Sequence, residues 1–339
     1  MDSRTSFSFS FRALAALLVA ALALTLLVAA CGGGSSDSTA LTSDVTTATG
    51  SPTPTAPTPP PSPAPTPTLV PVTSGPTSEP TFPHITPSPE PTPINPLGDQ
   101  KLYLALGDSL SAGNGASDPS RTSFVALITQ ALGASYEVLD LGVPGHTSDD
   151  LINKQLSRAV SEIQARNTDG IPGNETAAIT LEIGGNDLLN LYTSLVLPGT
   201  CPSVPEALQR PQCVDGLRNA LDHYRTNLEQ ILDALKAADP NVPIFLETLY
   251  NPFSGGANNL DQIGALALEG QAGTVFPDGL NDVIRQVGQE KGVTVVDWYP
   301  IFVGKSNQYI SQDLIHPNDT GYQLMAQAIL DAMAQAGLP

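Results

Sequence analysis

The sequence predicts an α/β fold, a three-layer α/β/α sandwich around a central, mainly parallel sheet of five strands. After about Asp99, five short apolar runs alternate with segments whose apolar residues recur at the spacing of an α-helix. Apolar strands that alternate with helices imply a parallel sheet covered on both faces. The part of the chain that carries this pattern, residues 99–339, is long enough to bury the core of a single α/β domain.

The strands are expected where apolar runs end at glycine or at a polar turn, over residues 102–106, 136–141, 178–183, 242–249 and 293–298. Helical spacing predicts a first helix over residues 124–132, stopped by Gly133. A second helix, through residues 151–163, is opened by Thr147 or Ser148. Three further helices are expected around residues 217–235, 280–287 and 322–333.

The N-terminal segment has the layout of a secretory signal peptide. Arg4 and Arg12 precede an apolar run, residues 13–30, that closes on Cys31. The segment resembles a bacterial lipoprotein signal, in which such a cysteine is lipidated and becomes the mature N-terminus. We therefore expect residues 1–31 to be a lipoprotein-type signal peptide with its lipobox cysteine at Cys31. An ordinary cleaved signal with an incidental cysteine and an uncleaved transmembrane anchor are the alternatives.

A Ser/Thr/Pro-rich stretch follows the signal. Of the 32 prolines, 18 lie between Ser51 and Gln100. Proline fixes φ and removes hydrogen-bond donors, so this composition favours extended chain and cannot pack a core. We expect residues 32–98 to be a disordered linker that carries the domain, residues 99–339, as a stalk through a cell wall. A Pro-rich ligand for a binding partner is the alternative, without a distinctive signature.

The charge balance limits the kinds of partner that the chain can bind. The chain has a net charge of −19, and residues 99–339 alone hold 12 Lys and Arg against 28 Asp and Glu. Phosphate binding needs a basic face, so no nucleic-acid partner is expected. An acidic surface also matches an anionic bilayer poorly, so membrane contact should depend on the lipid anchor. We expect a monomer outside the cytoplasm, lipid-anchored at the cell surface, or secreted if the signal is simply cleaved.

Cysteine usage agrees with export. If Cys31 is lipidated, Cys201 and Cys213 remain as an even pair. We expect a disulfide between them. Metal ligation is disfavoured because no histidine or further cysteine lies near in the sequence, and two free thiols are the other alternative.

Polar motifs follow the predicted strands, at the edge of the sheet where α/β proteins bind ligands. Gly107-Asp108-Ser109 comes directly after the first strand. A hydroxyl at a strand-to-helix turn is exposed, and the amides of the helix N-terminus favour developing negative charge. Taken alone, this tripeptide is also ordinary turn chemistry.

Two further motifs offer hydrogen-bond donors. Gly145, after the second strand, can present its N–H without a side chain in the way. Asn186, after the third strand, carries an amide donor that does not titrate, as an oxyanion hole requires. Each of these motifs also fits a plain turn.

Asp313 and His316 complete the set. A serine nucleophile needs a base, and the base needs a fixed tautomer. An aspartate three residues before a histidine can accept from Nδ1–H and leave Nε2 for the serine, and Pro317 keeps the histidine out of a continuing helix. Without the other motifs, such an Asp–His pair would be interpreted as two ordinary side chains on the surface.

The other histidines fit the role of base less well. His84 lies in the linker, and His223 on the long helix is expected to be solvated. His146 adjoins Gly145 and could line an acyl pocket, but it has no carboxylate at an orienting spacing.

Residues 101–337 resemble the SGNH/GDSL hydrolase family. The blocks that carry the resemblance are Gly107-Asp108-Ser109-Leu110-Ser111, Gly145, Gly185-Asn186-Asp187 and Asp313-Leu314-Ile315-His316-Pro317. The resemblance implies a flavodoxin-like fold and a nucleophile at Ser109. It also implies an oxyanion hole made by the amides of Ser109 and Gly145 with the side chain of Asn186, and a triad completed by Asp313 and His316.

Two features depart from the family pattern. Asp140 stands where the family often has an asparagine before the glycines of the second block. The stretch between Cys201 and Cys213 looks like an insertion that edges the substrate cleft.

We therefore expect an extracytoplasmic serine ester hydrolase, of esterase or lipase type, that cleaves small-molecule or lipid esters through an acyl-serine intermediate without metal or organic cofactor. O-acetyl groups on carbohydrate and thioesters are alternative substrates, although export argues against thioesters of coenzyme A. A surface-displayed binding module is the non-enzyme alternative, and the joint presence of all the motifs argues against it. Acyl-chain length stays open, because it depends on loops near residues 190–215 and 251–276 whose conformations the sequence does not give.

Overall fold

The computed structural model describes residues 98–256 and 259–339. The expected signal peptide with Cys31, His84 and all but the last residue of the expected linker therefore lie outside the described residues.

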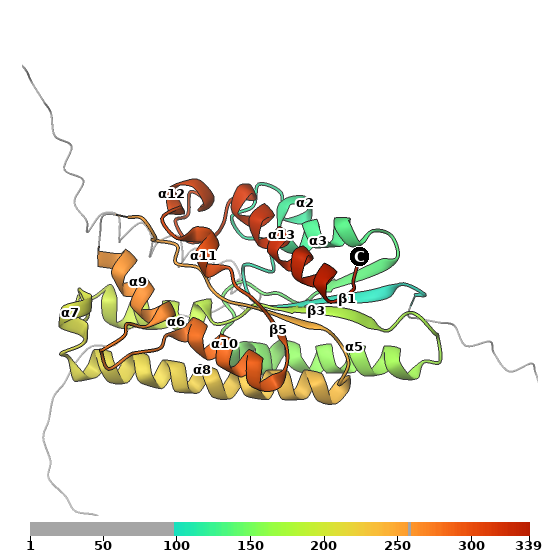
Figure 1. The fold of residues 1–339 in the computed structure, drawn as a ribbon, viewed down its shortest axis with the longest axis horizontal. Helices are drawn as coiled ribbons and strands as arrows, with labels where there is room; N and C mark the ends of the chain where they lie inside the picture. The colour runs from blue at the N-terminus through green and yellow to red at the C-terminus, as the bar shows by residue number, and fades with distance from the viewer. Residues whose placement is uncertain (1–97, 257–258) are drawn as a thin grey trace, which may run out of the picture. The chain divides into compact units, whose positions relative to one another are not determined.

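The described chain is built on a five-stranded sheet in the order β2-β1-β3-β4-β5 (Figure 1). The strands are β1 (Lys101–Leu106), β2 (Tyr136–Asp140), β3 (Thr176–Leu181), β4 (Ile244–Glu247) and β5 (Thr294–Val296). Every neighbouring pair is parallel, as predicted. β3 starts and ends two residues earlier than expected, and β4 and β5 are shorter than the apolar runs that contain them.

Side chains of the strands enter two apolar cores, one on each face of the sheet. In β1, for example, Leu104 packs with one core, and Tyr103 and Ala105 with the other. The first core is closed by α5 (Ser157–Thr168), α8 (Pro211–Ala238) and α10 (Leu280–Lys291). The second is closed by α3 (Phe124–Leu132) and α13 (Asp319–Gln335). The two groups of helices lie on opposite sides of the sheet in Figure 1, which confirms the predicted three-layer sandwich.

The helix boundaries follow local capping chemistry. Ser123 caps α3 through a hydrogen bond to the amide of Ala126, and Gly133 ends that helix. Thr147 opens the next helical segment in a capping box with Asp150.

That segment is not a regular α-helix throughout. It runs from α4 (Ser148–Asp150) through η1, a π-helix over Leu151–Leu156, into α5. The sequence pattern does not predict the π-helical turn. Such turns are often found at functional sites.

Further helices lie beyond the carboxyl ends of the strands, where the sequence left loops. They are α6 (Gly185–Leu191), the π-helix η2 (Tyr192–Val196), α7 (Val204–Ala207) and α9 (Asn259–Glu269). The stretch over residues 251–276, expected as a loop, thus contains a helix that buries Leu266 and Leu268.

Short helices connect the remaining elements: α2 (Pro119–Thr122), α11 (Tyr299–Phe302) and α12 (Ser306–Tyr309). The C-terminal segment then docks on the loop that follows β1. The hydroxyl of Tyr322 donates to the carbonyl of Asn114 at 2.6 Å. Asp319 accepts from the amide of Ser117 at 2.7 Å and from the hydroxyl of Thr122 at 2.9 Å. These contacts join residues about 200 positions apart and bring the Asp313–Pro317 segment to the end of β1.

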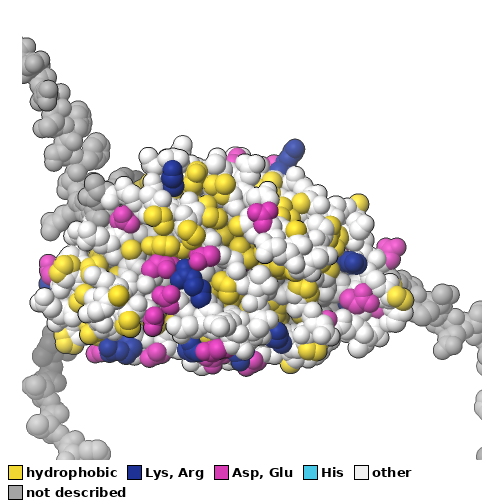
Figure 2. Space-filling model, in the orientation of Figure 1, with side chains coloured by type: hydrophobic (Ala, Val, Ile, Leu, Met, Phe, Trp, Pro, Cys, Tyr) yellow, Lys and Arg dark blue, Asp and Glu magenta, His cyan; other side chains and the backbone are white. Residues whose placement is uncertain are grey.

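The surface in view carries no basic patch. In Figure 2 the Lys and Arg side chains are scattered and lie beside Asp and Glu. Within the described ranges, no helix combines the length and the apolar character that a membrane span needs.

Candidate active site

Ser109, His316 and Asp313 form a hydrogen-bonded series. The Oγ of Ser109 lies 2.9 Å from Nε2 of His316, and Nδ1 of His316 lies 2.7 Å from Oδ2 of Asp313. Because Asp313 accepts at Nδ1, that nitrogen carries the proton and Nε2 is left as an acceptor for the serine hydroxyl. The structure thus brings together three residues that the sequence separates by up to 207 positions.

The carboxylate of Asp313 is held in its charged form. Desolvation acts against the charge, but hydrogen bonds from the His316 ring and from the amides of Ile315 and His316 outweigh it. The pKa of Asp313 is therefore well below its ordinary value. Leu314, which lies between Asp313 and Ile315 in the chain, has a φ of 67°. This is the left-handed region, which residues other than glycine rarely adopt.

The turn that carries Ser109 differs from the expected one. No helix begins at Ser109; residues 108–116 form a series of turns, and the next helix starts at Pro119. Gly113 and Gly115 take φ values of 79° and 87°, which end any right-handed helix there. Ser109 is also only 9% exposed, so it is more buried than expected, although it lines the cavity described below.

Asp108, the residue before Ser109, is hydrogen-bonded to Asn186. Nδ2 of Asn186 donates to Oδ2 of Asp108 at 2.9 Å and to the carbonyl of His146 at 2.9 Å. Oδ1 of Asp108 accepts from the amide of Leu110 at 3.0 Å. Asp108 is 2% exposed, and burial raises its pKa. Asn186 thereby ties the loop after β2 to the turn after β1.

Gly145 lies on the exposed loop after β2 with a φ of 84°. Among the described residues, neither its N–H nor that of Ser109 has a hydrogen-bond acceptor. Asp140, the departure from the family pattern, accepts from the amide of Gly142 at 2.8 Å and so supports the start of this loop. The two free amides are therefore available to a ligand.

Gln155, on the π-helical turn η1, connects the two loops that carry these amides. Its Nε2 donates to the carbonyl of Gly107 at 2.7 Å and to Nδ1 of His146 at 2.8 Å, and its Oε1 accepts from the amide of Gly107 at 3.2 Å. Desolvation lowers the pKa of His146, which favours the neutral ring that this contact needs. His146 is buried and is not among the residues that line the cavity described below.

A second hydrogen-bond network joins α4, which follows this loop, to α6 and α8. The carboxylate of Asp187 accepts from the amide and the hydroxyl of Ser148, at 3.0 and 2.6 Å. The side chain of Asn227 donates to the Ser148 hydroxyl at 2.9 Å. His223 is exposed to solvent, as expected, and its Nε2 also lies 2.9 Å from Oδ2 of Asp149.

Two buried glutamates lie at the ends of β3 and β4. Glu182 and Glu247 are both 0% exposed. Among the described residues, Oε1 of Glu182 and both carboxyl oxygens of Glu247 have no hydrogen-bond partner. Burial raises the pKa of each carboxyl well above its ordinary value, because it disfavours the charged form. Sequence reasoning missed them, although a carboxyl in an apolar strand is itself a signal.

A cavity of about 150 Å³ opens beside Ser109 and His316. Its walls come from α6 and η2 on one side and from α9 and the loop after β4 on the other. Apart from Asp108, Ser109, Asn186 and His316, most lining side chains are apolar. The cavity therefore extends from the serine into the part of the fold that the sequence did not predict.

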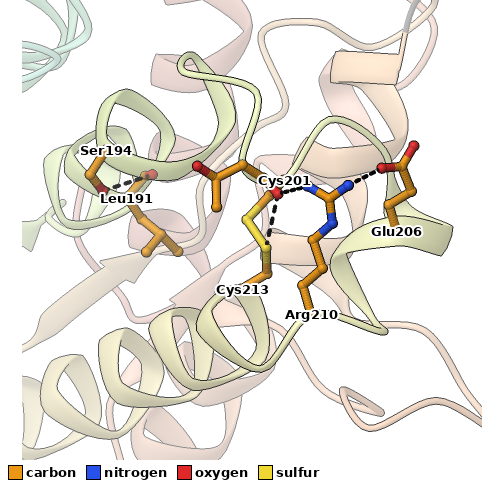
Figure 3. Close-up of a disulfide and its surroundings, with 7 residues drawn as sticks. Leu191, Ser194, Cys201, Glu206, Arg210 and Cys213 are labelled. Atoms are coloured by element: carbon orange, nitrogen blue, oxygen red, sulfur yellow. Dashed lines mark hydrogen bonds and ion pairs between the residues drawn. A yellow bond between two sulfur atoms is a disulfide. The ribbon is translucent and has the colours of Figure 1, made fainter.

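The predicted disulfide between Cys201 and Cys213 is confirmed (Figure 3). It ties the segment after η2 to the first turn of α8. The amide of Cys201 donates to the carbonyl of Leu195 at 2.9 Å, and Arg210 bonds both the carbonyl of Thr200 and the carboxylate of Glu206. Neither cysteine lines the cavity, so the bridge supports the η2 wall of the cavity without forming part of it.

Within the part of the chain that the structure describes, no three His, Cys, Asp or Glu side chains gather in a way that could hold a metal ion.

Residues 105–324 match the model of the GDSL-like lipase/acylhydrolase family. Protein YpmR of Bacillus subtilis is 26% identical over 242 residues, which cover 69% of this chain and 82% of that protein. The spore germination lipase LipC of Bacillus licheniformis is 24% identical over 234 residues, 67% of this chain and 93% of the lipase. Among solved structures, an extracellular lipase from Streptomyces rimosus is 20% identical with a TM-score of 0.49, over 68% of this chain and 99% of that one.

Proposed function

The chain is an ester hydrolase that belongs to the GDSL-like lipase/acylhydrolase family, and we propose that it cleaves carboxylic esters outside the cytoplasm with Ser109 as nucleophile. The observation that carries the proposal is the series Ser109–His316–Asp313, with contacts of 2.9 and 2.7 Å. A serine paired with a neutral imidazole, itself oriented by a carboxylate, is the arrangement that activates a hydroxyl for attack.

In the first half of the reaction, the Oγ of Ser109 attacks the ester carbonyl while its proton passes to Nε2 of His316. The tetrahedral intermediate then collapses, the bond to the alcohol oxygen breaks, and His316 returns the proton to the leaving alcohol. In the second half, a water molecule loses a proton to His316 and attacks the acyl-serine. The acid leaves, and Ser109 recovers its proton.

The free amides of Ser109 and Gly145 are the donors for the oxyanion. Nδ2 of Asn186 is the third, and because it already donates to Asp108 and to the His146 carbonyl, an oxyanion shares one of these hydrogens. Asn186→Ala removes that donor and should lower turnover by about 10²–10³-fold. Turnover close to that of the unchanged protein would count against the assignment.

Labelling tests the nucleophile directly. A fluorophosphonate probe should form an adduct on Ser109, located by peptide mass spectrometry. Ser109→Ala should lose both the adduct and ester hydrolysis, whereas Ser111→Ala, a neighbouring buried serine, should keep the adduct. An unlabelled Ser109 in a folded protein would instead favour a binding module.

A pair of histidine variants tests the base. His316→Ala should lower the rate of ester hydrolysis by about 10⁴-fold or more, because no group then takes the serine proton. His146→Ala should lower it far less, since His146 contacts Gln155 and not the serine. The reverse order would show that the triad is wrong.

We also propose that the domain is tethered to the outer face of the membrane through Cys31. The Arg-flanked apolar run that ends at this cysteine supports the proposal, and the Cys201–Cys213 bridge agrees with an oxidising compartment. Mass spectrometry of the mature N-terminus should find a lipidated Cys31, and Cys31→Ser should release the enzyme from membranes. A mature N-terminus downstream of residue 31 would contradict the tether.

A further inference from the structure

The cavity beside Ser109 differs chemically from a site for a short acyl group. The side chains of Ser109, His316, Asn186 and Asp108 supply the polar groups at one end. The walls beyond them are apolar: Leu188, Leu189, Leu191 and Val196 on α6 and η2, and Ile263, Ala267 and Leu268 on α9. A wall of this kind gains free energy only by burying hydrocarbon.

Of the three polar side chains farther along the wall, Tyr192, Tyr250 and Asn251, the last two are already engaged. Asn251 donates to the carbonyl and to the carboxylate of Asp261, and its Oδ1 accepts from the amide of Phe253. The hydroxyl of Tyr250 donates to the carbonyl of Ile315 at 2.8 Å. These walls therefore offer little to a sugar, whose hydroxyl groups would lose their hydrogen bonds to water on entering.

The size of the cavity sets the length of the occupant. An engineered apolar cavity of comparable volume, about 150 Å³, binds benzene, a molecule of six carbons. An acetyl group has one methyl carbon beyond the carbonyl and would leave most of this space empty.

The walls are also held in place. Tyr192 of η2 and Phe253 of the loop after β4 both line the cavity and pack against each other, with ring centroids 6.2 Å apart. The segment after η2 is fixed by the Cys201–Cys213 bridge and by the hydrogen bond from the Cys201 amide to Leu195. The cavity is therefore formed by residues that are held in place by packing and by the disulfide.

We propose that this cavity is an acyl site and that the enzyme prefers esters of medium-chain acids, with about six to eight carbons, over acetyl esters. The proposal rests on the proposed function, because Ser109 must be the atom that the acyl group joins. Each methylene buried against the wall should raise kcat/KM about fourfold, so a hexanoate ester should exceed an acetate ester on the order of 100-fold.

The test is hydrolysis of p-nitrophenyl esters from acetate to palmitate by the full-length enzyme. We expect the highest kcat/KM at hexanoate to octanoate. Ala267→Phe places a ring in the cavity and should lower the ratio of octanoate to acetate hydrolysis by at least about tenfold. Ala265→Phe, the same change on the same helix at a residue that does not line the cavity, should leave that ratio at the value of the unchanged enzyme.

The outcomes separate the two proposals. If Ser109 takes the fluorophosphonate and acetate is the best substrate, or if both variants change the ratio equally, the acyl site is wrong and the serine hydrolase stands. If Ser109 takes no probe and no ester is cleaved at any length, both fall. Should Ala267→Phe fail to fold, Ala267→Leu carries the same test with a smaller expected fall in the ratio.

Discussion

Nε2 of Gln155 lies 2.8 Å from Nδ1 of His146, and this contact links the two loops that carry the free amides of the active site. The same amide group bonds both the N–H and the carbonyl of Gly107, two residues before Ser109. Because Nε2 is a donor, Nδ1 of His146 must accept, and the ring must be neutral. Gln155 thus positions the loops without touching a substrate.

Gln155→Leu tests this positioning role. The change removes three hydrogen bonds and leaves the N–H of Gly107 unpaired in a buried site, although its carbonyl still accepts from the amide of Val143. We therefore expect kcat to fall about 10–100-fold with KM little changed. The ester kinetics of Gln155→Leu should be compared with those of Gln164→Leu, a matched change at an exposed position of α5. Equal kinetics in the two variants would contradict the role. Gln155→Glu is a second check: its carboxylate favours a protonated His146, so the acid limb of the pH profile should change shape.

Leu314 carries backbone strain between the aspartate and the histidine of the triad. A left-handed conformation costs a residue with a side chain about 1–2 kcal/mol, and a β-branched side chain fits it worst. In urea unfolding, Leu314→Val should lower the free energy of unfolding by about 1–2 kcal/mol. Leu314→Gly should change it by less than about 1 kcal/mol, since relief of strain offsets the greater freedom of the unfolded chain. If glycine costs more than valine, packing of the half-exposed leucine matters more than its backbone.

The disulfide should stabilise the domain by restricting the unfolded chain. The bridge joins residues 12 positions apart, and a loop of about this length corresponds to about 3 kcal/mol in the chain-entropy view. The double variant Cys201→Ser, Cys213→Ser should lose about that much free energy of unfolding in urea. Reductant should destabilise the unchanged protein to a similar extent and leave the double variant unaffected. A reductant effect of equal size on both proteins would contradict this explanation.

Glu247 should make stability fall as pH rises. The unfolded chain releases this proton near the ordinary pKa of 4.5, whereas burial raises the pKa in the folded state. Above pH 4.5 the folded protein therefore holds a proton that the unfolded chain lacks, and folding becomes less favourable with each step in pH. Glu247→Gln removes this dependence.

Urea unfolding between pH 5 and 8 measures the effect. The free energy of unfolding of Glu247→Gln, minus that of the unchanged protein, should rise with pH by up to about 1.4 kcal/mol per unit. Glu162→Gln, on the surface helix α5, serves as the control and should give a constant difference. A constant difference for Glu247→Gln as well would show that the folded state does not hold this proton.

The sequence predicts the layered core well because strands such as β1 and helices such as α3 follow from local patterns of apolar residues and caps. It does not predict α6, η2 or α9, because these elements depend on packing around the cavity and on the disulfide. Gln155 is a different case. It occupies a position between Leu151 and Ala159 on the buried face of its helix, and a polar side chain there indicates a specific buried contact.

The docking of α13 on the loop after β1 has a consequence for the timing of activity. Ser109 and His316 are 207 positions apart, so the proposed nucleophile leaves the ribosome long before the proposed base. No partial chain that stops short of His316 can hydrolyse an ester by this route, which keeps the enzyme inert while it is being made. The same dependence acts in reverse on warming: if the last helix detaches first, catalysis stops while most of the sheet is still intact.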